Sequence, residues 1–187
     1  HVAGPGGGYE FPADLKDLRV RVRGAKLVTD TYVALGARPT GLALADAQAA
    51  FAAGTLDGQD AAAVTLVAAR AWGTGTHHVV QWGAFANAMV FTVRKSLWQT
   101  WPEATRTMVR DAAIKAIESA KAYEREHAAH DELARNGITL TRTTSAGHAA
   151  FRAAVEPVYK EWTPRIGASL VEAVQTAAEK AAPVAGN

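Results

Sequence analysis

The segment from Ala13 to Asp60 constrains the fold of this 187-residue chain more than any other part of it. It contains ADLKDLRVRVRG, LGARPT and AAFAAGTLDGQD in that order. This order predicts a turn, a strand, a helix, a short strand, a second helix and a further strand. Leu18, Val20 and Val22 alternate with polar residues, which is typical of a strand with one buried face. Because strands alternate with helices, the chain is predicted to adopt an α/β fold with a mixed or parallel sheet.

Turn and helix-end signals extend this prediction along the rest of the chain. Gly36 and Gly54 follow helical patterns and suit the left-handed conformation at a helix end. The glycine-rich run GPGGG at residues 4–8 is interpreted as a flexible connector that no strand precedes. The predicted elements are helices over 25–35, 44–53 and 61–72, strands over 77–82 and 87–93, a helix from Pro102 to about Arg135, a strand over 138–141, and helices over 145–163 and 167–182, with Pro164 ending the first of these two.

Composition excludes several classes of function. The chain has 20 basic and 18 acidic residues and a net charge of +2, and it carries no basic stripe with interleaved aromatics of the kind that binds nucleic acid. It has no cysteine, which rules out disulfides and thiolate chemistry. The chain contains no stretch of 18 apolar residues, so the sequence predicts no membrane span. The opening HVAGPGGGYEF lacks the features of a signal peptide, so we expect a mature or truncated start.

Arg21 is the strongest candidate for a ligand anchor. It lies at the end of the first predicted strand, where α/β proteins place ligands. A guanidinium is always charged and matches a carboxylate through two parallel hydrogen bonds. By alternation, however, Arg19, Arg21 and Arg23 share one face of the strand. The pattern alone favours the alternative that all three line a solvated sheet face.

A metal site is a second possibility. His127, His130 and Asp131 are spaced so that both imidazoles share one helix face, as in a metal-dependent hydrolase or lyase. The same positions continue a stripe of small apolar residues, which favours partly buried histidines at a helix contact. His77 and His78 are adjacent in a predicted strand and point to opposite faces, so they cannot bind one metal together. No serine nucleophile motif is present, and a helical protein-interaction domain is a third alternative.

The order and spacing of these segments resemble the extracytoplasmic solute-binding proteins of tripartite ATP-independent periplasmic (TRAP) transporters. DLKDLRVRV resembles the family's D-L-K-G-L segment and the strand that follows it. GARPT resembles its G-A-x-P-T turn, and LADAQAAFAAGTLDGQD resembles its F-x-E-x-Y-x-A-L-Q-x-G-x-V-D-G-Q-E stretch. The W-P-E start of the long helix is also similar. The resemblance runs from about Asp14 to Gly167.

This resemblance implies both a fold and a function. The fold would be a helix-rich α/β lobe like those of periplasmic binding proteins, with a mixed sheet and a long helix that crosses the hinge. The protein would be the substrate-binding subunit of a TRAP-type secondary transporter. It would capture a small organic acid in the periplasm and deliver it to the membrane subunits. By resemblance it is not an enzyme, needs no cofactor and binds no nucleic acid.

The resemblance also implies a set of ligand-binding residues. Arg21 stands at the position of the arginine that anchors the substrate carboxylate. Leu44 replaces a frequent cleft aromatic, Ala61 replaces a ligand-contacting asparagine, and Gly41 replaces a proline. Trp82, at the end of a strand, is expected to line the cleft beside the GAFA segment. The expected ligand-binding set is Arg21, Leu44, Asp60, Ala61, Trp82 and Phe85.

The family's mature proteins are nearly twice as long, and the chain resembles only their second half. The resemblance divides it into a connector (1–13), a C-terminal lobe (14–82 and 128–187) and a segment that crosses to a missing first lobe (83–127). We therefore expect a fragment with apolar surface exposed on NAMVFTV and the long helix, and with a tendency to self-associate.

Overall fold

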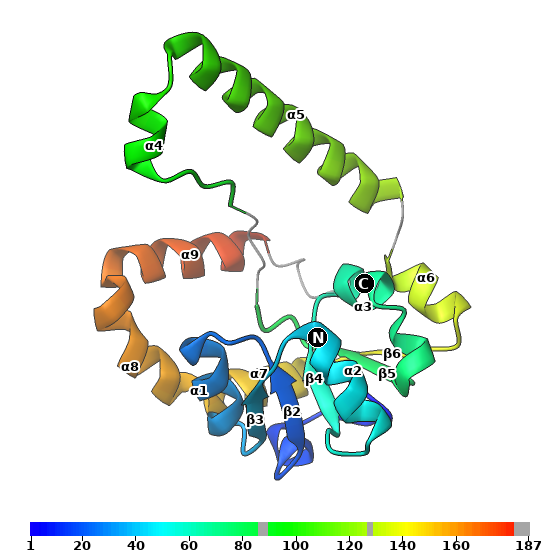
Figure 1. Cartoon of the computed structure of the whole chain (residues 1–187). Coiled ribbons are helices and arrows are strands. Elements are labelled where there is room, and N and C mark those ends of the chain that lie inside the picture. Colours follow the sequence, from blue (N-terminus) through cyan, green and yellow to red (C-terminus); the bar gives the residue numbers. More distant parts are fainter. Residues whose placement is uncertain (86–89, 127–128, 182–187) are drawn as a thin grey trace.

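A computed structural model describes residues 1–85, 90–126 and 129–181. Its described strands form one mixed sheet in the order β3-β2-β4-β1-β5-β6 (Figure 1). Strand β2 is parallel to β3 and β4, β5 is parallel to β6, and β1 is antiparallel to both β4 and β5. Every strand except β1 therefore runs in one direction, and the carboxyl ends of β2, β4 and β5 meet at one edge. The strands are β1 Val2–Gly4, β2 Arg19–Val22, β3 Arg38–Gly41, β4 Gly58–Asp60, β5 His78–Gln81 and β6 Thr139–Arg142.

Helices cover both faces of the sheet, and α4 and α5 extend away from it (Figure 1). The predicted α/β class with a mixed sheet and much helix is confirmed. The short 3-10 helices are η1 Pro12–Leu15 and η2 Ala71–Thr74. The α-helices are α1 Lys26–Ala34, α2 Leu44–Ala52, α3 Ala63–Ala68, α4 Lys95–Thr100, α5 Glu103–Glu126, α6 Ala129–Arg135, α7 Ser145–Ala154, α8 Glu156–Ile166 and α9 Ala168–Ala181.

The core has two parts, one on each side of the sheet. On one side Val20 and Val22 of β2 pack with Tyr32 of α1 and Phe151 of α7, and Leu18 packs against this cluster as its alternation predicts. On the other side the core contains Ala3, Ala61, Ala63, Leu66, Ala71, Val79, Leu133 and Ile138. Many of these residues are alanines, so the helices of the second face lie close to the sheet.

Four predictions of local structure are wrong. The glycine run is preceded by a strand, since β1 pairs with β4 and β5 in the middle of the sheet. The strand predicted over 87–93 is absent from residues 90–93, while 87–89 lie outside the described residues. The helix predicted over 145–163 is two helices, because Pro157 has no N–H to continue α7 and instead starts α8. Pro164 lies inside the last turn of α8 rather than ending it.

The long helix predicted from Pro102 to about Arg135 corresponds to two helices in the structure. Its predicted ends agree with the start of α5 at Glu103 and the end of α6 at Arg135. Residues 127–128 lie between these helices, outside the described part. Among the described residues no helix is both long enough and apolar enough to cross a membrane.

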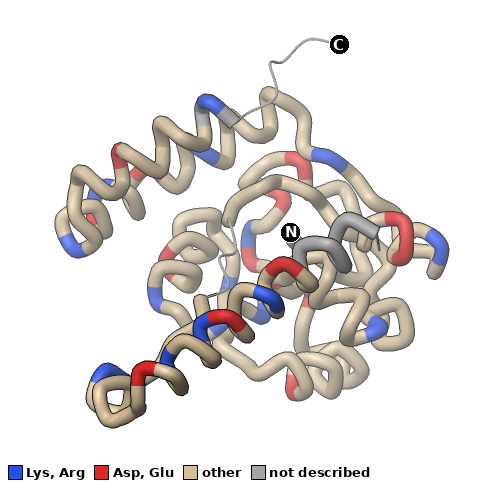
Figure 2. Tube along the Cα trace, turned by 90° about the horizontal axis from the view of Figure 1, so that it is seen from above, with Lys and Arg blue, Asp and Glu red and all other residues tan. Residues whose placement is uncertain are grey.

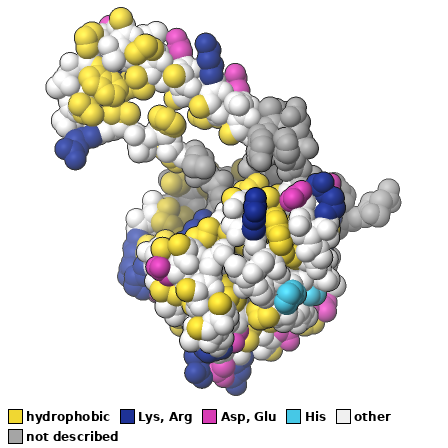
Figure 3. Space-filling model, turned by 45° about the vertical axis from the view of Figure 1, so that its right-hand side comes forward, with side chains coloured by type: hydrophobic (Ala, Val, Ile, Leu, Met, Phe, Trp, Pro, Cys, Tyr) yellow, Lys and Arg dark blue, Asp and Glu magenta, His cyan; other side chains and the backbone are white. Residues whose placement is uncertain are grey.

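The predicted exposure of apolar side chains next to and along the long helix is confirmed. Val90 and Phe91 are 72% and 66% exposed, and Met108, Ile114 and Ile117 of α5 are also exposed. Figure 3 shows hydrophobic side chains gathered over the segment that stands apart from the sheet. Basic and acidic residues alternate along α5 in Figure 2, so no charge of one sign collects there.

An ion pair holds the amino ends of β2 and β4 together. Arg19 donates from Nε to Asp57 Oδ2 (2.8 Å) and from Nη2 to Asp57 Oδ1 (2.6 Å). The Arg19 backbone N–H also donates to Oδ2 (2.9 Å), and the Asp57 N–H donates to the Arg19 carbonyl (2.9 Å). These hydrogen bonds lower the pKa of Asp57 to about 2. Four hydrogen bonds between two residues therefore fix the register of the strands that carry Arg21 and Asp60.

We expect Gly4→Ala to destabilise the fold by about 1–3 kcal/mol, the usual cost of overpacking. A Cβ at Gly4 would collide with the carbonyl oxygen of Asp57, and a backbone atom cannot rotate away. Urea unfolding followed by circular dichroism measures the change. Gly73→Ala is the control, since a Cβ there meets no atom within 4 Å. Equal stability of the two variants would contradict the close approach of β1 to the turn before β4.

We expect Asp57→Asn to lower Tm by a few degrees at pH 7. The folded state holds the Asp57 pKa near 2, below its ordinary value of 3.8. The ion pair therefore stabilises the fold fully above about pH 4, and this contribution is lost as the pH falls through about 2. Thermal unfolding of wild type and variant should converge over that interval.

The control for this experiment is Asp17→Asn, which removes the same charge from a more exposed pair with Arg38. That substitution should lower Tm less at pH 7. A difference between wild type and Asp57→Asn that persists well below pH 2 would mean that the carboxylate charge is not what stabilises the strand pair.

Candidate ligand site

The carboxyl edge of the parallel strands brings together the predicted site residues. Arg21 lies in β2, Asp60 ends β4 and Ala61 follows it, and Trp82 follows β5. Because all three strands point the same way, these side chains reach one end of the sheet although about 60 residues separate the first from the last.

Arg21 is a buried cation held by backbone carbonyls. The residue is 7% exposed. Its Nε donates to the Leu42 carbonyl (2.8 Å) and its Nη1 donates to the Asp60 carbonyl (3.4 Å). Within the described residues Nη2 makes no hydrogen bond. The two carbonyls fix the plane of the guanidinium and leave its Nη2 hydrogens for another acceptor.

Arg21 carries its positive charge in a buried position. Burial lowers the pKa of the guanidinium, the Asp60 carboxylate raises it, and the neighbouring Arg23 lowers it again. Arginine stays protonated at any working pH in spite of such shifts. The alternative that Arg21 is one of three arginines on a solvated face is therefore wrong for this residue, whereas Arg19 and Arg23 are partly exposed and paired with Asp57 and Asp60.

Asp60 is the buried acidic partner in this cluster. It is 2% exposed, and its Oδ1 accepts a hydrogen bond from the Tyr32 hydroxyl (3.3 Å). Its Oδ2 lies 3.3 Å from Arg23 Nη2, at ion-pair distance. No hydrogen bond of the described residues reaches Oδ2. Burial, and next the Asp60 charge, raise the pKa of Tyr32 well above its usual range, so Tyr32 remains a neutral donor.

Aromatic side chains border the charged cluster. Trp82 packs edge-on against Tyr32, with ring centroids 5.9 Å apart, and lies 6.3 Å from Phe85. The Trp82 ring also contacts Phe151 (4.7 Å). Its indole Nε1 is buried and has no hydrogen-bond partner among the described residues. Trp82 packs against Tyr32, which bonds with Asp60, so Trp82 and Phe85 form an apolar surface beside this acid.

Leu44 and Ala61 are the two predicted ligand-binding residues that, by resemblance, stand in place of an aromatic residue and an asparagine. Leu44 begins α2, two residues after the carbonyl that accepts from Arg21, and is half-buried. Ala61 is buried, and its methyl group packs in the second core cluster with Ala63 and Leu66. Both positions therefore carry apolar side chains.

Sequence reasoning missed two members of the cluster. Tyr32 was only part of a predicted helix, and Arg23 was assigned to a solvated face. A signal for Tyr32 was its position one helical turn after Val28, which places both on the buried face of α1. No sequence signal indicated that Arg23 pairs with Asp60, because 37 residues separate them and only the β2–β4 register joins them.

The residues of the metal hypothesis are not brought together. His127 lies outside the described residues, and His130 Nε2 lies 3.4 Å from His1 Nε2. His78 Nε2 instead bonds with Thr141 Oγ1 (2.7 Å). The described residues contain no group of at least three histidine or acidic side chains placed to hold a metal ion.

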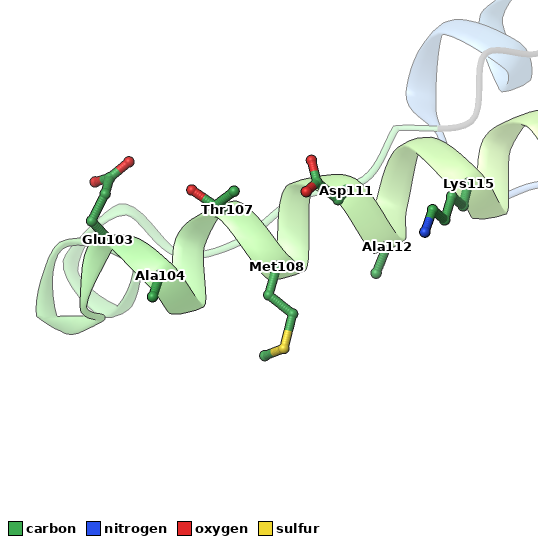
Figure 4. A pocket seen from close by; sticks show the side chains of 7 residues that line it. All are labelled: Glu103, Ala104, Thr107, Met108, Asp111, Ala112 and Lys115. Carbon is green, nitrogen blue, oxygen red and sulfur yellow. The ribbon is translucent and has the colours of Figure 1, made fainter.

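A hollow elsewhere on the molecule is unrelated to this cluster. Figure 4 shows that α5 alone lines it, with Met108 projecting on the side of Ala104 and Ala112, opposite Thr107. A groove along one exposed helix offers no enclosing walls, so the charged cluster at the strand ends is the better candidate site.

Comparison with known proteins gives a consistent assignment. The family model described as bacterial extracellular solute-binding protein, family 7, matches residues 7–165. A solute-binding protein of Roseobacter denitrificans is 29% identical over 152 residues, which cover 78% of this chain and 44% of that protein. Another from Verminephrobacter eiseniae is 24% identical over 179 residues, which cover 95% and 52%. The chain thus spans about half the length of these curated relatives.

Solved structures agree with the fold. A TRAP periplasmic solute-binding protein from Ralstonia eutropha with bound (S)-2-acetolactate matches with a TM-score of 0.88 and 35% identity, over 96% of this chain and 59% of that one. A succinate-bound TRAP protein from Shewanella oneidensis shares the fold, with a TM-score of 0.78 and 16% identity over 92% and 57%. The family match covers most of the chain, and the strand-end cluster lies within it. The chain therefore belongs to family 7 of the bacterial extracellular solute-binding proteins.

Proposed function

We propose that this protein is the substrate-binding subunit of a TRAP-type secondary transporter, which captures a small organic acid in the periplasm and delivers it to the membrane subunits. The observation that carries the proposal is the buried guanidinium of Arg21, oriented by two carbonyls and with Nη2 unused by the described residues. The family assignment and the carboxylate bound by the Ralstonia eutropha protein support it.

Binding in this proposal is purely non-covalent. The ligand carboxylate accepts hydrogen bonds from Arg21, whose charge acts strongly because the site is shielded from water. Trp82 and Phe85 supply the apolar wall that ligand sites commonly have. Closure of a second lobe over the ligand excludes the remaining water, and opening releases the acid unchanged. No bond of the ligand is made or broken, so the protein acts as a carrier and not as an enzyme.

The division of the chain follows from the same proposal. Residues 14–82 and 128–187 form the lobe that holds Arg21, and 83–127 cross toward a first lobe. The separation of α4 and α5 from the sheet supports this division (Figure 1). The exposed apolar side chains of α5 would then face another folded unit.

We expect Arg21→Lys to weaken binding of the acid roughly tenfold or more, or about 1–3 kcal/mol. Lysine keeps the positive charge but loses the planar fork that orients a carboxylate. Calorimetric titration of the protein expressed from its whole coding sequence, with a panel of organic acids, measures the loss. Wild type should also gain thermal stability with an acid that binds.

Arg19→Lys is the matched control. It lies two residues away on the same strand and keeps its charge, but its partner is Asp57 at the opposite end of β2. This variant should lose some stability and keep its affinity. Equal affinity of wild type, Arg19→Lys and Arg21→Lys would remove Arg21 from the site, and a panel without any binding acid would overturn the transport proposal.

We also propose that the 187-residue chain self-associates through α5, where Met108 is 63% exposed. Sedimentation should then give a mass above 19.7 kDa. Met108→Lys should shift the chain toward the monomer, since a charge at an apolar contact opposes its burial. Thr107→Lys, on the other side of the helix (Figure 4), should leave association unchanged. A monomeric wild-type chain at high concentration would contradict this expectation.

A further inference from the structure

We propose that His1 and His130 form a binding site for a divalent transition metal of the Zn²⁺ type, in which the Nε2 atoms of both imidazoles are ligands. The site joins the start of β1 to α6. It is separate from the proposed capture of an organic acid and does not depend on it. It also differs from the metal set predicted from the sequence, because its two ligands are 129 residues apart and it needs no acidic side chain.

The first argument is the distance between the two imidazoles. His1 Nε2 and His130 Nε2 are 3.4 Å apart. An imidazole nitrogen lies about 2.0–2.1 Å from a tetrahedral Zn²⁺ ion, so two such nitrogens on one ion are about 3.3–3.4 Å apart. Hydrogen bonds donated by N–H groups are usually shorter, at about 2.7–3.2 Å. A bridging metal ion therefore fits this separation better than a shared proton does.

The second argument is the orientation of the rings. Their centroids are 5.4 Å apart, which is farther than the two Nε2 atoms are from each other, and the ring planes are tilted by 54°. The rings therefore do not stack but approach each other with their Nε2 edges. The lone pair of an imidazole nitrogen lies in the plane of its ring and points outward. Both lone pairs are thus available to the space between His1 and His130.

The third argument is that two separate parts of the fold hold the ligands in place. His1 precedes β1 in the middle of the sheet, and its carbonyl accepts a hydrogen bond from the Ala61 N–H (3.2 Å). His130 lies in α6, which is anchored in the second core cluster by the fully buried Leu133 and by Ala129. Because both backbones are fixed without a metal, little conformational entropy is lost when an ion binds.

The residue types determine which metal the site can hold. Imidazole nitrogen suits Zn²⁺, Cu²⁺ and Ni²⁺, whereas Mg²⁺ and Ca²⁺ prefer oxygen ligands. Among the described residues, no third histidine or acidic side chain stands close enough to complete a group of three. Water then occupies the remaining coordination positions. We therefore expect a site that exchanges its ion and binds it less tightly than a structural zinc site with four protein ligands.

Calorimetric titration with ZnCl₂ tests the proposal on the protein expressed from its whole coding sequence, without a polyhistidine tag. Wild type should bind Zn²⁺ saturably, and MgCl₂ at the same concentrations should give no binding. Zn²⁺ should also raise Tm, and a chelator should reverse the rise. The reason is that only the folded chain brings His1 and His130 together, and an ion that binds the folded state alone stabilises it.

Variants identify the ligands. His130 is exposed, so His130→Gln is expected to fold. It should weaken Zn²⁺ binding about 100-fold or more, because the second imidazole of a pair acts at a high effective concentration. His1→Gln should cause the same loss, and the double variant should lose little more. The matched control is His148→Gln, which removes an exposed histidine from α7 and should bind Zn²⁺ like wild type.

The outcome for His130→Gln decides the proposal, since His1 is half-buried and its substitution is the more disruptive of the two. A loss of Zn²⁺ affinity and of the Tm rise in this variant, but not in His148→Gln, supports the site. If wild type does not bind Zn²⁺ saturably, or if His130→Gln binds it as tightly as wild type, the proposal is overturned. The proposed capture of an organic acid stands or falls separately, because no acid enters this experiment.

Discussion

The parallel pairing of β2 with β4 is the constraint on which the site depends. Val20 and Arg21 align with Gly58 and Gln59, so the residues that follow each strand emerge at the same edge. The Arg19–Asp57 clamp fixes this register at the opposite end of the two strands. A slip of one residue would turn Arg21 toward the other face of the sheet and separate it from the Asp60 carbonyl. The geometry of the ligand site is therefore set by hydrogen bonds that lie far from any ligand.

Burying Arg21 is costly, and the structure offsets that cost with groups that come from the fold itself. Backbone carbonyls of Leu42 and Asp60 accept from the guanidinium, and the Asp60 carboxylate compensates its charge. Neither carbonyl depends on the identity of a side chain, so the anchor tolerates substitutions at neighbouring positions. The cluster is organised before a ligand arrives, which reduces the entropy lost on binding.

The sequence predicted the parts of the fold that local patterns determine. Alternation identified β2, and glycines marked the ends of α1 and α2. It did not predict β1, because Val2–Gly4 is too short to show a period and is stabilised only by strands more than 50 residues away. The division of residues 145–166 into two helices was not predicted, because the helix break was placed at Pro164. The structure shows that Pro157, at the start of α8, marks the break instead. In the site, Arg21 was found by its place on a strand, whereas the Arg23–Asp60 contact depends on tertiary register and had no local signal.

Strand β1 has a consequence for how the chain reaches this structure. The sheet consists of two groups of parallel strands, β3-β2-β4 and β5-β6, and β1 is the strand that joins them. Val2 pairs with Asp60 on one side and with Val80 on the other. During synthesis, residues 2–4 must therefore wait until at least residue 80 has left the ribosome before the centre of the sheet can close. Until β1 pairs, the facing edges of β4 and β5 are unpaired, and these are the surfaces that a chaperone would have to protect.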